Sequence, residues 1–203
     1  LPGMAWEIST YLANSGGVAD STALYFVWGG ANDFLAGDSP IQAAQNVASY
    51  VSTLAQAGAA HFLVPNLPGL SLTPLARDGG VVVPAKIFTA AFNTELATQL
   101  NDISAIFPAA DIIQFDIFYL INENIQNPAD AGFTEVQNAC LPSHLVAPCA
   151  NPNKHIFWDD LHPTTEANTI IAAAFASAVP EPGIIILLLT GMLALVVIPR
   201  RKN

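Results

Sequence analysis

Three short apolar runs, separated by helical segments, limit the possible fold more than any other feature of this sequence. Residues 23–28 (ALYFVW), 61–65 (HFLVP) and 111–116 (DIIQFD) have the length and composition of strands that are buried on both faces. Between them, residues 40–56 and 85–107 carry apolar side chains at helical spacing. This alternation predicts a three-layer α/β/α sandwich with a mostly parallel sheet.

The remaining segments extend the pattern. Helices are expected over residues 5–14, 117–125 and 165–178, and Ile156 and Phe157 are expected to form a last strand remnant. Residues 66–83 and 127–153 are expected to be long loops. Functional sites in parallel sheets lie at the C-terminal ends of strands, so candidate site residues are expected directly after these apolar runs.

The charge distribution excludes one class of partner. Residues 1–181 contain all 16 acidic residues and three of the six basic ones, so their formal charge is −13. A protein that binds nucleic acid needs a positive surface to neutralise phosphates. We therefore expect no nucleic-acid partner.

Residues 157–164 (FWDDLHPT) place a carboxylate and an imidazole close together ahead of a predicted helix. Asp159 and His162 are three positions apart, and Pro163 and Thr164 are suited to the start of the helix. His can transfer protons near neutral pH, and Asp can fix its tautomer and stabilise the imidazolium. Taken alone, the pair is more often a hydrogen bond that holds a loop together.

Residues 29–33 (GGAND) follow the first predicted strand directly. Gly30 permits a sharp turn and a close approach of the backbone, and the amide of Asn32 can donate to a developing negative charge on a carbonyl oxygen. By themselves these residues are an ordinary Gly-Asn-Asp turn. Together with the downstream Asp-x-x-His pattern, they favour an oxyanion site.

In this order and separation, the two motifs resemble those of the SGNH, or GDSL-type, ester hydrolases. Residues 28–34 (WGGANDF) resemble the third sequence block of that family, G-x-N-D, and residues 158–164 (WDDLHPT) resemble its fifth block, D-x-x-H. Residues 64–68 and 115–116 are similar to the lipase/lecithinase branch. The resemblance covers about residues 1–178, which implies one hydrolase domain with a flavodoxin-like sheet.

The resemblance implies a role for each site residue. His162 becomes the general base and acid, Asp159 orients it, Asn32 donates to the oxyanion, and Gly30 and Asp33 shape the loop that carries Asn32. The implied reaction is serine acyl transfer on an ester or lipid, through an acyl-enzyme that water hydrolyses. It needs no metal and no organic cofactor.

The chain departs from the family pattern at the nucleophile. The family has a Gly-Asp-Ser block ahead of G-x-N-D, followed by a second block with an oxyanion glycine, and neither is present here. A Gly-Asp-Ser sequence does occur at residues 37–39, after G-x-N-D. Ser39 precedes Pro40 at a predicted helix start, so we expect it to be an N-cap. We expect the nucleophile to precede Leu1 in a longer protein, and this chain alone to be inactive.

Two cysteines, Cys140 and Cys149, lie in the irregular stretch over residues 127–153. They can form a disulfide in an oxidising compartment or remain two unpaired thiols. Two sulfurs without clustered histidines supply too few ligands for a metal, so no metal site is expected.

The C-terminal residues 179–203 have a different character. Residues 183–199 form an uncharged run of transmembrane length at the short end of the range, and Arg200, Arg201 and Lys202 follow. With the sequence Pro180-Glu181-Pro182, this tail is similar to the PEP-CTERM sorting signal of exported bacterial proteins. The resemblance implies export, a transmembrane helix over residues 183–199, and cleavage by a sorting protease at residues 180–182, which leaves the protein at the cell surface or outside the cell. The alternative is a buried C-terminal helix.

The leading interpretation is therefore part of an exported, membrane-anchored ester hydrolase. The alternative is a non-catalytic surface-binding module on the same fold, and a Gly-Asp-Ser block ahead of Leu1 separates the two. A third interpretation pairs Asp159 with Asp160 as glycosidase carboxylates. Adjacent residues rarely face each other across a substrate, so this interpretation is disfavoured.

Overall fold

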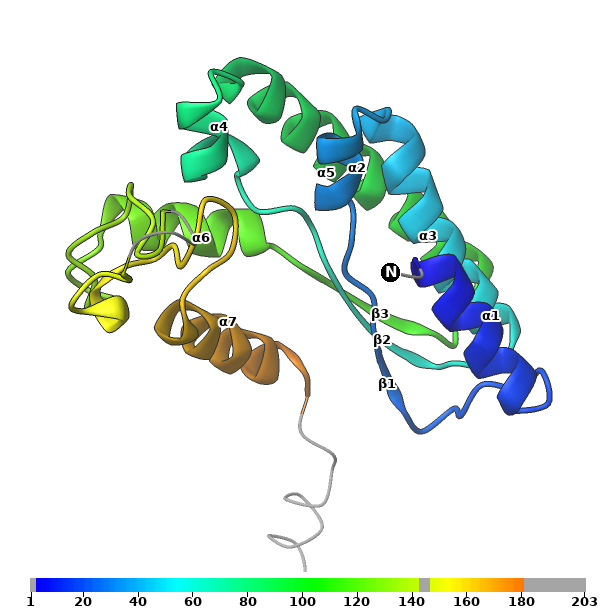
Figure 1. The fold of residues 1–203 in the computed structure, drawn as a ribbon. Coiled ribbons are helices and arrows are strands. Elements are labelled where there is room, and N and C mark those ends of the chain that lie inside the picture. Colours follow the sequence, from blue (N-terminus) through cyan, green and yellow to red (C-terminus); the bar gives the residue numbers. More distant parts are fainter. Residues whose placement is uncertain (1–2, 143–146, 181–203) are drawn as a thin grey trace, which may run out of the picture.

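A computed structural model describes residues 3–142 and 147–180 of the chain. Three strands alternate with helices along the sequence (Figure 1). The elements are α1 (Met4–Asn14), β1 (Leu24–Phe26), α2 (Ala31–Ala36), α3 (Pro40–Gln56), β2 (His61–Pro65), η1 (Leu70–Leu72), α4 (Pro74–Asp78), α5 (Val82–Ile106), β3 (Asp111–Phe115), α6 (Ile117–Gln126), η2 (Pro152–Lys154) and α7 (Thr165–Ala178).

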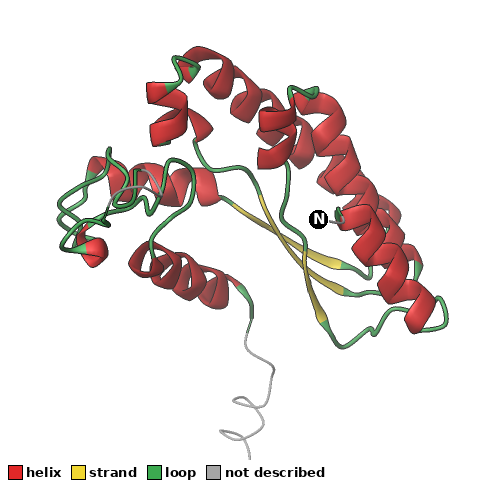
Figure 2. Ribbon diagram, in the orientation of Figure 1, coloured by secondary structure: helices red, strands yellow, loops and turns green. Residues whose placement is uncertain are grey.

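The strands form one parallel sheet in the order β1-β2-β3. Phe62 of β2 is opposite Tyr25 of β1 and Ile112 of β3, so β2 is the central strand. Parallel strands need crossover connections, and helices provide them here: α2 and α3 connect β1 to β2, and α5 connects β2 to β3 (Figure 2). The sheet is short because β1 has only three residues.

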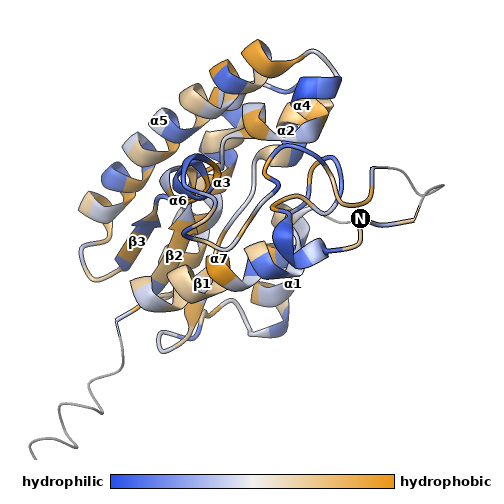
Figure 3. Cartoon of the chain, turned by 90° about the vertical axis from the view of Figure 1, so that its left-hand side faces the viewer, coloured by the Kyte–Doolittle hydropathy of each residue, from blue (hydrophilic) through white to orange (hydrophobic). Residues whose placement is uncertain are grey.

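The larger core lies between the sheet and helices α1, α3 and α5. Tyr25 and Phe62 point to this side, where Tyr25 packs against Tyr11 of α1. Phe62 and Phe92 are completely buried. The strands β1 and β2 are the most uniformly hydrophobic segments of the sheet, whereas α5 alternates between hydrophobic and hydrophilic residues (Figure 3). This amphipathic pattern is what packs a helix onto one face of a sheet.

Helix α7 covers part of the opposite face. Its Phe175 contacts Phe26 of β1, Trp28 after β1 and Phe115 of β3, with ring centroids 4.8 to 5.7 Å apart. Ile171 of the same helix packs with residues of α6 in a separate apolar cluster. Helices therefore lie on both faces of the parallel sheet.

Most of the expected elements are confirmed, with four differences. The expected strand over residues 23–28 is not buried on both faces, because β1 lies at the edge of the described sheet and its Leu24 and Phe26 are 45% and 48% exposed. The expected strand remnant at Ile156 and Phe157 is wrong, because Phe157 makes only an isolated bridge to Pro163. The expected loop over residues 66–83 contains η1 and α4, and a helix, α2, was not expected after β1. In the described ranges 3–142 and 147–180, no helix is long and apolar enough to cross a membrane; the predicted span 183–199 lies outside them.

Candidate active site

A compact loop between residues 157 and 164 carries Asp159 and His162. Phe157 and Pro163 form an antiparallel bridge across its base. The backbone N–H of Trp158 donates to the carbonyl of His162 over 2.8 Å. These two interactions bring the ends of the loop together, so Asp159 and His162 are held on one short turn.

Thr164 fixes the loop to helix α7. Its side chain is buried, and its hydroxyl donates to the carbonyl of His155 over 2.7 Å. The same oxygen accepts the N–H of Ala167 over 3.2 Å and so caps the N-terminus of α7. On the other side of the loop, the N–H of Leu75 in α4 donates to the carbonyl of Asp160. The loop is therefore held between two helices.

The structure brings Asp159 and His162 into direct contact. Nδ1 of His162 lies 2.9 Å from Oδ2 and 3.1 Å from Oδ1 of Asp159. A neutral imidazole that donates its Nδ1 proton to a carboxylate keeps a free lone pair on Nε2. The side chain of His162 is 70% exposed, so this nitrogen is accessible to a reacting group. The geometry suits a general base.

Asp159 is held by the backbone as well. Its Oδ1 accepts the N–H groups of Leu161 and His162, at 2.9 and 2.6 Å. Partial burial raises the pKa of Asp159, but these two N–H groups and the imidazole of His162 together outweigh it, so the pKa lies below its ordinary value. The carboxylate therefore stays ionised beside the imidazole.

Asn32 comes from the start of helix α2. Gly30 precedes this helix with φ = +110°, a conformation that side chains rarely adopt. A Cβ at Gly30 would lie only 2.4 Å from the ring of the buried Phe92. The glycine thus allows the chain to turn closely over the core and to present Asn32 on the surface. No hydrogen bond joins the Asn32 amide to another described residue, so it is free to donate to a ligand.

One cavity brings the two motifs together. Asn32 and His162 both line a cavity of about 210 Å³. Trp28, which lies in the chain between β1 and α2, lines the same cavity. Apart from Thr73, the rest of its wall is apolar. The residues after β1 and the loop before α7 are separated by 130 positions (Asn32 to His162) and nevertheless meet at one site, as the position of both motifs after apolar runs led us to expect.

Two other residues singled out in the sequence, Asp33 and Ser39, do not line the cavity. Asp33 is partly buried in α2, and its burial and the nearby Asp38 raise its pKa. Ser39 caps α3, because its hydroxyl accepts the N–H of Gln42, as expected. In the part of the chain that the structure describes, no three His, Cys, Asp or Glu side chains are grouped closely enough to hold a metal ion.

Comparison with known proteins agrees with the two motifs. The GDSL-like lipase/acylhydrolase family matches residues 5–175. The chain belongs to this family. It is 34% identical to "Esterase EstA" of Pseudomonas aeruginosa over 188 residues, which is 84% of the chain and 28% of that protein. It is 32% identical to an "uncharacterized protein in trpE-trpG intergenic region" of Pseudomonas putida (85% and 31%) and 29% identical to a GDSL esterase/lipase of Arabidopsis thaliana (75% and 49%).

The chain covers only part of the length of these relatives. The chain spans between about a quarter and a half of these three relatives. The matched residues include both G-x-N-D and D-x-x-H, whereas the Gly-Asp-Ser at residues 37–39 is part of a helix cap. The GDSL-type nucleophile is not among the residues of the site described above.

A disulfide lies next to the loop that carries Asp159 and His162. Cys140 and Cys149 are bonded to each other, 4.8 Å apart at Cα. The N–H of Cys140 donates to the carbonyl of Phe157 over 3.0 Å, and the N–H of Leu141 donates to the carbonyl of Trp158. The bonded segment thus runs beside the first residues of the Asp159–His162 loop.

Sequence reasoning missed the apolar wall of the cavity. It includes Ile117 and Ile121 of α6 and Ile171 of α7. The spacing of Ile117 and Ile121 predicts one face of a helix, but nothing in it indicates that this face borders a site. Sequence reasoning also missed Asn66, whose carbonyl accepts the indole N–H of Trp28 over 3.0 Å and so positions that ring at the cavity.

Proposed function

We propose that this chain provides the histidine, aspartate and oxyanion part of a serine ester hydrolase. The observation that carries the proposal is the single cavity shared by Asn32 and His162, with His162 held by Asp159. In the proposed reaction, Nε2 of His162 takes the proton of a serine hydroxyl while that oxygen attacks the ester carbonyl. The amide of Asn32 donates to the carbonyl oxygen as it becomes negative.

The second half of the cycle uses the same groups. His162 returns its proton to the leaving alcohol, and an acyl-enzyme remains on the serine. Water then attacks the acyl group, again with His162 as base, and the carboxylic acid leaves. Asp159 stabilises the imidazolium in both steps without taking its proton.

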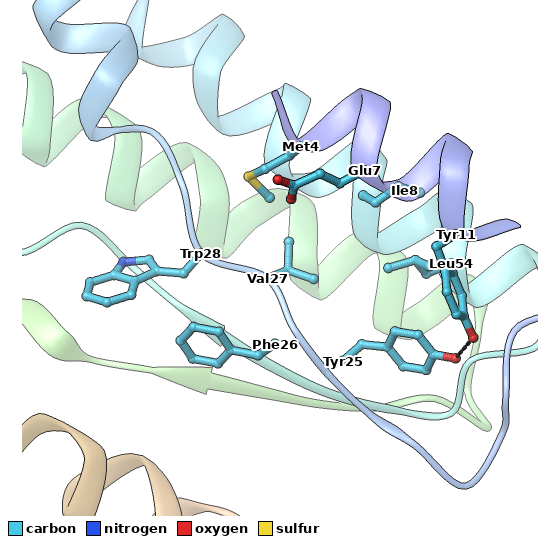
Figure 4. A pocket seen from close by; sticks show the side chains of 9 residues that line it. All are labelled: Met4, Glu7, Ile8, Tyr11, Tyr25, Phe26, Val27, Trp28 and Leu54. Carbon is cyan, nitrogen blue, oxygen red and sulfur yellow. Dashed lines mark hydrogen bonds between the residues drawn. The ribbon is translucent and has the colours of Figure 1, made fainter. Parts of the chain in front are cut away.

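We further propose that the serine comes from a segment that joins the free edge of β1. Among the described strands, β1 pairs only with β2, and its Phe26 is 48% exposed. A groove of about 310 Å³ lies between β1 and α1, lined by apolar side chains such as Met4 and Val27 (Figure 4). An unpaired strand edge beside an apolar groove is suited to an added strand.

The position of this edge fits the chemistry. The C-terminal ends of parallel strands lie at the same edge of a sheet, so a strand added in parallel would end beside Gly30 and Asn32. A serine at its end would then face the cavity that His162 also lines. Relatives two to three times as long as the matched part of this chain have room for such a segment.

The test is ester hydrolysis by the full-length protein. Reading the coding DNA in frame upstream of Leu1 shows whether a Gly-Asp-Ser block is encoded. If it is, the protein is expected to hydrolyse p-nitrophenyl esters, and replacing that serine by alanine is expected to abolish the activity. If no such block is encoded and no ester is hydrolysed, the site favours the non-catalytic binding module instead, because the histidine pair would then have no nucleophile.

We also propose that the protein is exported and transiently anchored through residues 183–199. The apolar run, the basic residues 200–202 and Pro180-Glu181-Pro182 support this proposal. A disulfide is also typical of proteins outside the cytosol. Cell fractionation with mass spectrometry of the mature C-terminus tests it: a mature protein ending near residue 181 is expected, and a cytosolic protein with an intact tail would contradict it.

A further inference from the structure

The cavity beside His162 is lined by exposed polar groups and by buried apolar ones. His162 and Asn32 are exposed, whereas Ile117, Ile121 and Ile171 are 0%, 8% and 5% exposed. These three isoleucines come from α6 and α7 and form one apolar cluster. A ligand that enters the cavity would therefore place its reacting group beside the polar groups and an apolar part among the isoleucines.

The polar groups elsewhere in the wall are already used. The hydroxyl of Thr73 donates to the carbonyl of Leu70 over 2.8 Å and accepts the N–H of Ala76 over 3.2 Å. The indole N–H of Trp28 donates to the carbonyl of Asn66. No polar side chain in the buried part of the wall is left to bind a hydroxyl, a sugar or a phosphate, each of which would lose hydrogen bonds to water there.

We propose that this cavity binds the acyl chain of the substrate and selects chains of medium length. The proposal rests on the function proposed above, because the ligand is inferred to be an ester from the proposed roles of His162 and Asn32. If a methylene group takes about the 30 Å³ that a water molecule occupies in the liquid, the cavity of about 210 Å³ holds about seven carbons. Hexanoyl to octanoyl esters fit this space, an acetyl group leaves most of it empty, and a palmitoyl chain exceeds it.

Binding of neutral, non-hydrolysable amides to this chain tests the proposal without a nucleophile. Butanamide, hexanamide, octanamide and decanamide keep the carbonyl and differ only in chain length, and calorimetry gives their affinities. Affinity is expected to rise about fourfold per methylene up to about octanamide and then to level off, since each buried methylene contributes a constant increment. Affinity that does not depend on chain length would overturn the proposal.

Two opposite substitutions at one position make the test specific. Ile121→Phe is expected to move the preferred chain length down by about one carbon, and Ile121→Ala, which removes three carbons from the wall, to move it up by about two or three. Leu161→Phe, at a half-buried position in the same wall, replaces the first variant if that one does not fold. Ile103→Ala is the matched control, because it removes the same atoms from α5 in the other core and is expected to leave the profile unchanged. A profile that moves with neither Ile121 variant contradicts the proposal.

The same series separates this proposal from the proposed function. His162→Ala is expected to retain the chain-length profile of amide binding, because His162 is exposed, whereas the isoleucines are buried. Affinity that rises with chain length and levels off near octanamide, in a full-length protein that hydrolyses no ester, would leave the cavity assignment standing and contradict the hydrolase. Ester hydrolysis that is independent of acyl-chain length would support the hydrolase and contradict the assignment of the cavity to the acyl chain.

Discussion

At the scale of single residues, Asn32 has no role in the fold that would explain its position. Its side chain is exposed and makes no hydrogen bond to another described residue. Asn32→Ala is therefore expected to leave stability unchanged and to lower kcat of the full-length enzyme on the order of a hundredfold, the usual effect of removing one oxyanion donor. Steady-state kinetics on a p-nitrophenyl ester measures this. Leu35→Ala, in the exposed part of the same helix, is the control, and a loss below about threefold for Asn32→Ala would place the oxyanion donor elsewhere.

Gly30 and Gly37 flank helix α2. Comparing them distinguishes the effect of a positive φ from the effect of steric overlap with a Cβ. Both have positive φ, +110° and +79°, but a Cβ at Gly30 would overlap Phe92, whereas a Cβ at Gly37 has nothing within 4 Å. Gly37→Ala is expected to cost about 1 kcal/mol of unfolding free energy, and Gly30→Ala about 2–4 kcal/mol because overpacking adds to the backbone strain. Urea unfolding measures both. Equal losses would mean that the overlap with Phe92 is relieved by small shifts.

The pKa of Asp159 makes a small part of the stability dependent on pH. Because the folded state lowers this pKa below 3.8, the ionised carboxylate stabilises the fold above that pH, and the contribution is lost as the pH falls through the folded value. Asp159→Asn keeps the acceptor oxygen and removes the charge. The variant is expected to be less stable than wild type at pH 6, by under about 1 kcal/mol since the side chain is partly exposed, and this difference is expected to shrink as the pH falls through the folded pKa of Asp159. A stability gap that stays constant with pH would contradict the assignment.

At the scale of elements, the disulfide segment is hydrogen-bonded to the loop that carries Asp159 and His162. The Cys140–Cys149 segment donates two backbone hydrogen bonds to Phe157 and Trp158. Closing a loop of this length is expected to contribute about 2–3 kcal/mol by restricting the unfolded chain. Urea unfolding of the Cys140→Ser/Cys149→Ser double variant, compared with wild type, measures this loss. Wild-type stability in the double variant would mean that the surrounding hydrogen bonds suffice.

Elements also show how far sequence reasoning reaches. Strands β2 and β3 and helices α3 and α7 follow the predicted residues closely, because continuous apolar runs and helical spacing reflect burial directly. Helix α2 was missed because Asn32 within it, and Gly30 and Gly37 on either side of it, are typical of turns. Helix α4 was missed because only five residues separate Thr73 from Gly79. Local composition cannot distinguish such short helices from loops.

For the candidate site too, the sequence predicts some parts and not others. Asp159 and His162 could be predicted as a pair because they are close in sequence, and Asn32 because it follows an apolar run of strand-like residues. The cavity could not be predicted. Its wall combines Ile117 of α6, Ile171 of α7 and Phe157 of the loop, and only the packing of α6 and α7 on each other brings them together.

At the scale of the whole molecule, the parallel sheet places two distant segments at one edge. Asn32 follows β1, His162 precedes α7, and both border the same cavity. The formal charge of −13 over residues 1–181 disfavours nucleic acid as a partner and is compatible with a neutral ester substrate. The free edge of β1 completes the arrangement, since it is the place where a nucleophile could join the site.

The most direct test of this account is the activity of His162→Ala in the full-length protein. Without the imidazole, no group described at the site can take the proton of the serine, so kcat/KM for a p-nitrophenyl ester is expected to fall by about 10³- to 10⁶-fold with the fold intact. Asp160→Ala, on the neighbouring exposed carboxylate, is the control and is expected to change activity by less than about twofold. Wild-type-like hydrolysis by His162→Ala would show that Asp159 and His162 only hold the loop together, and that the chemistry lies elsewhere.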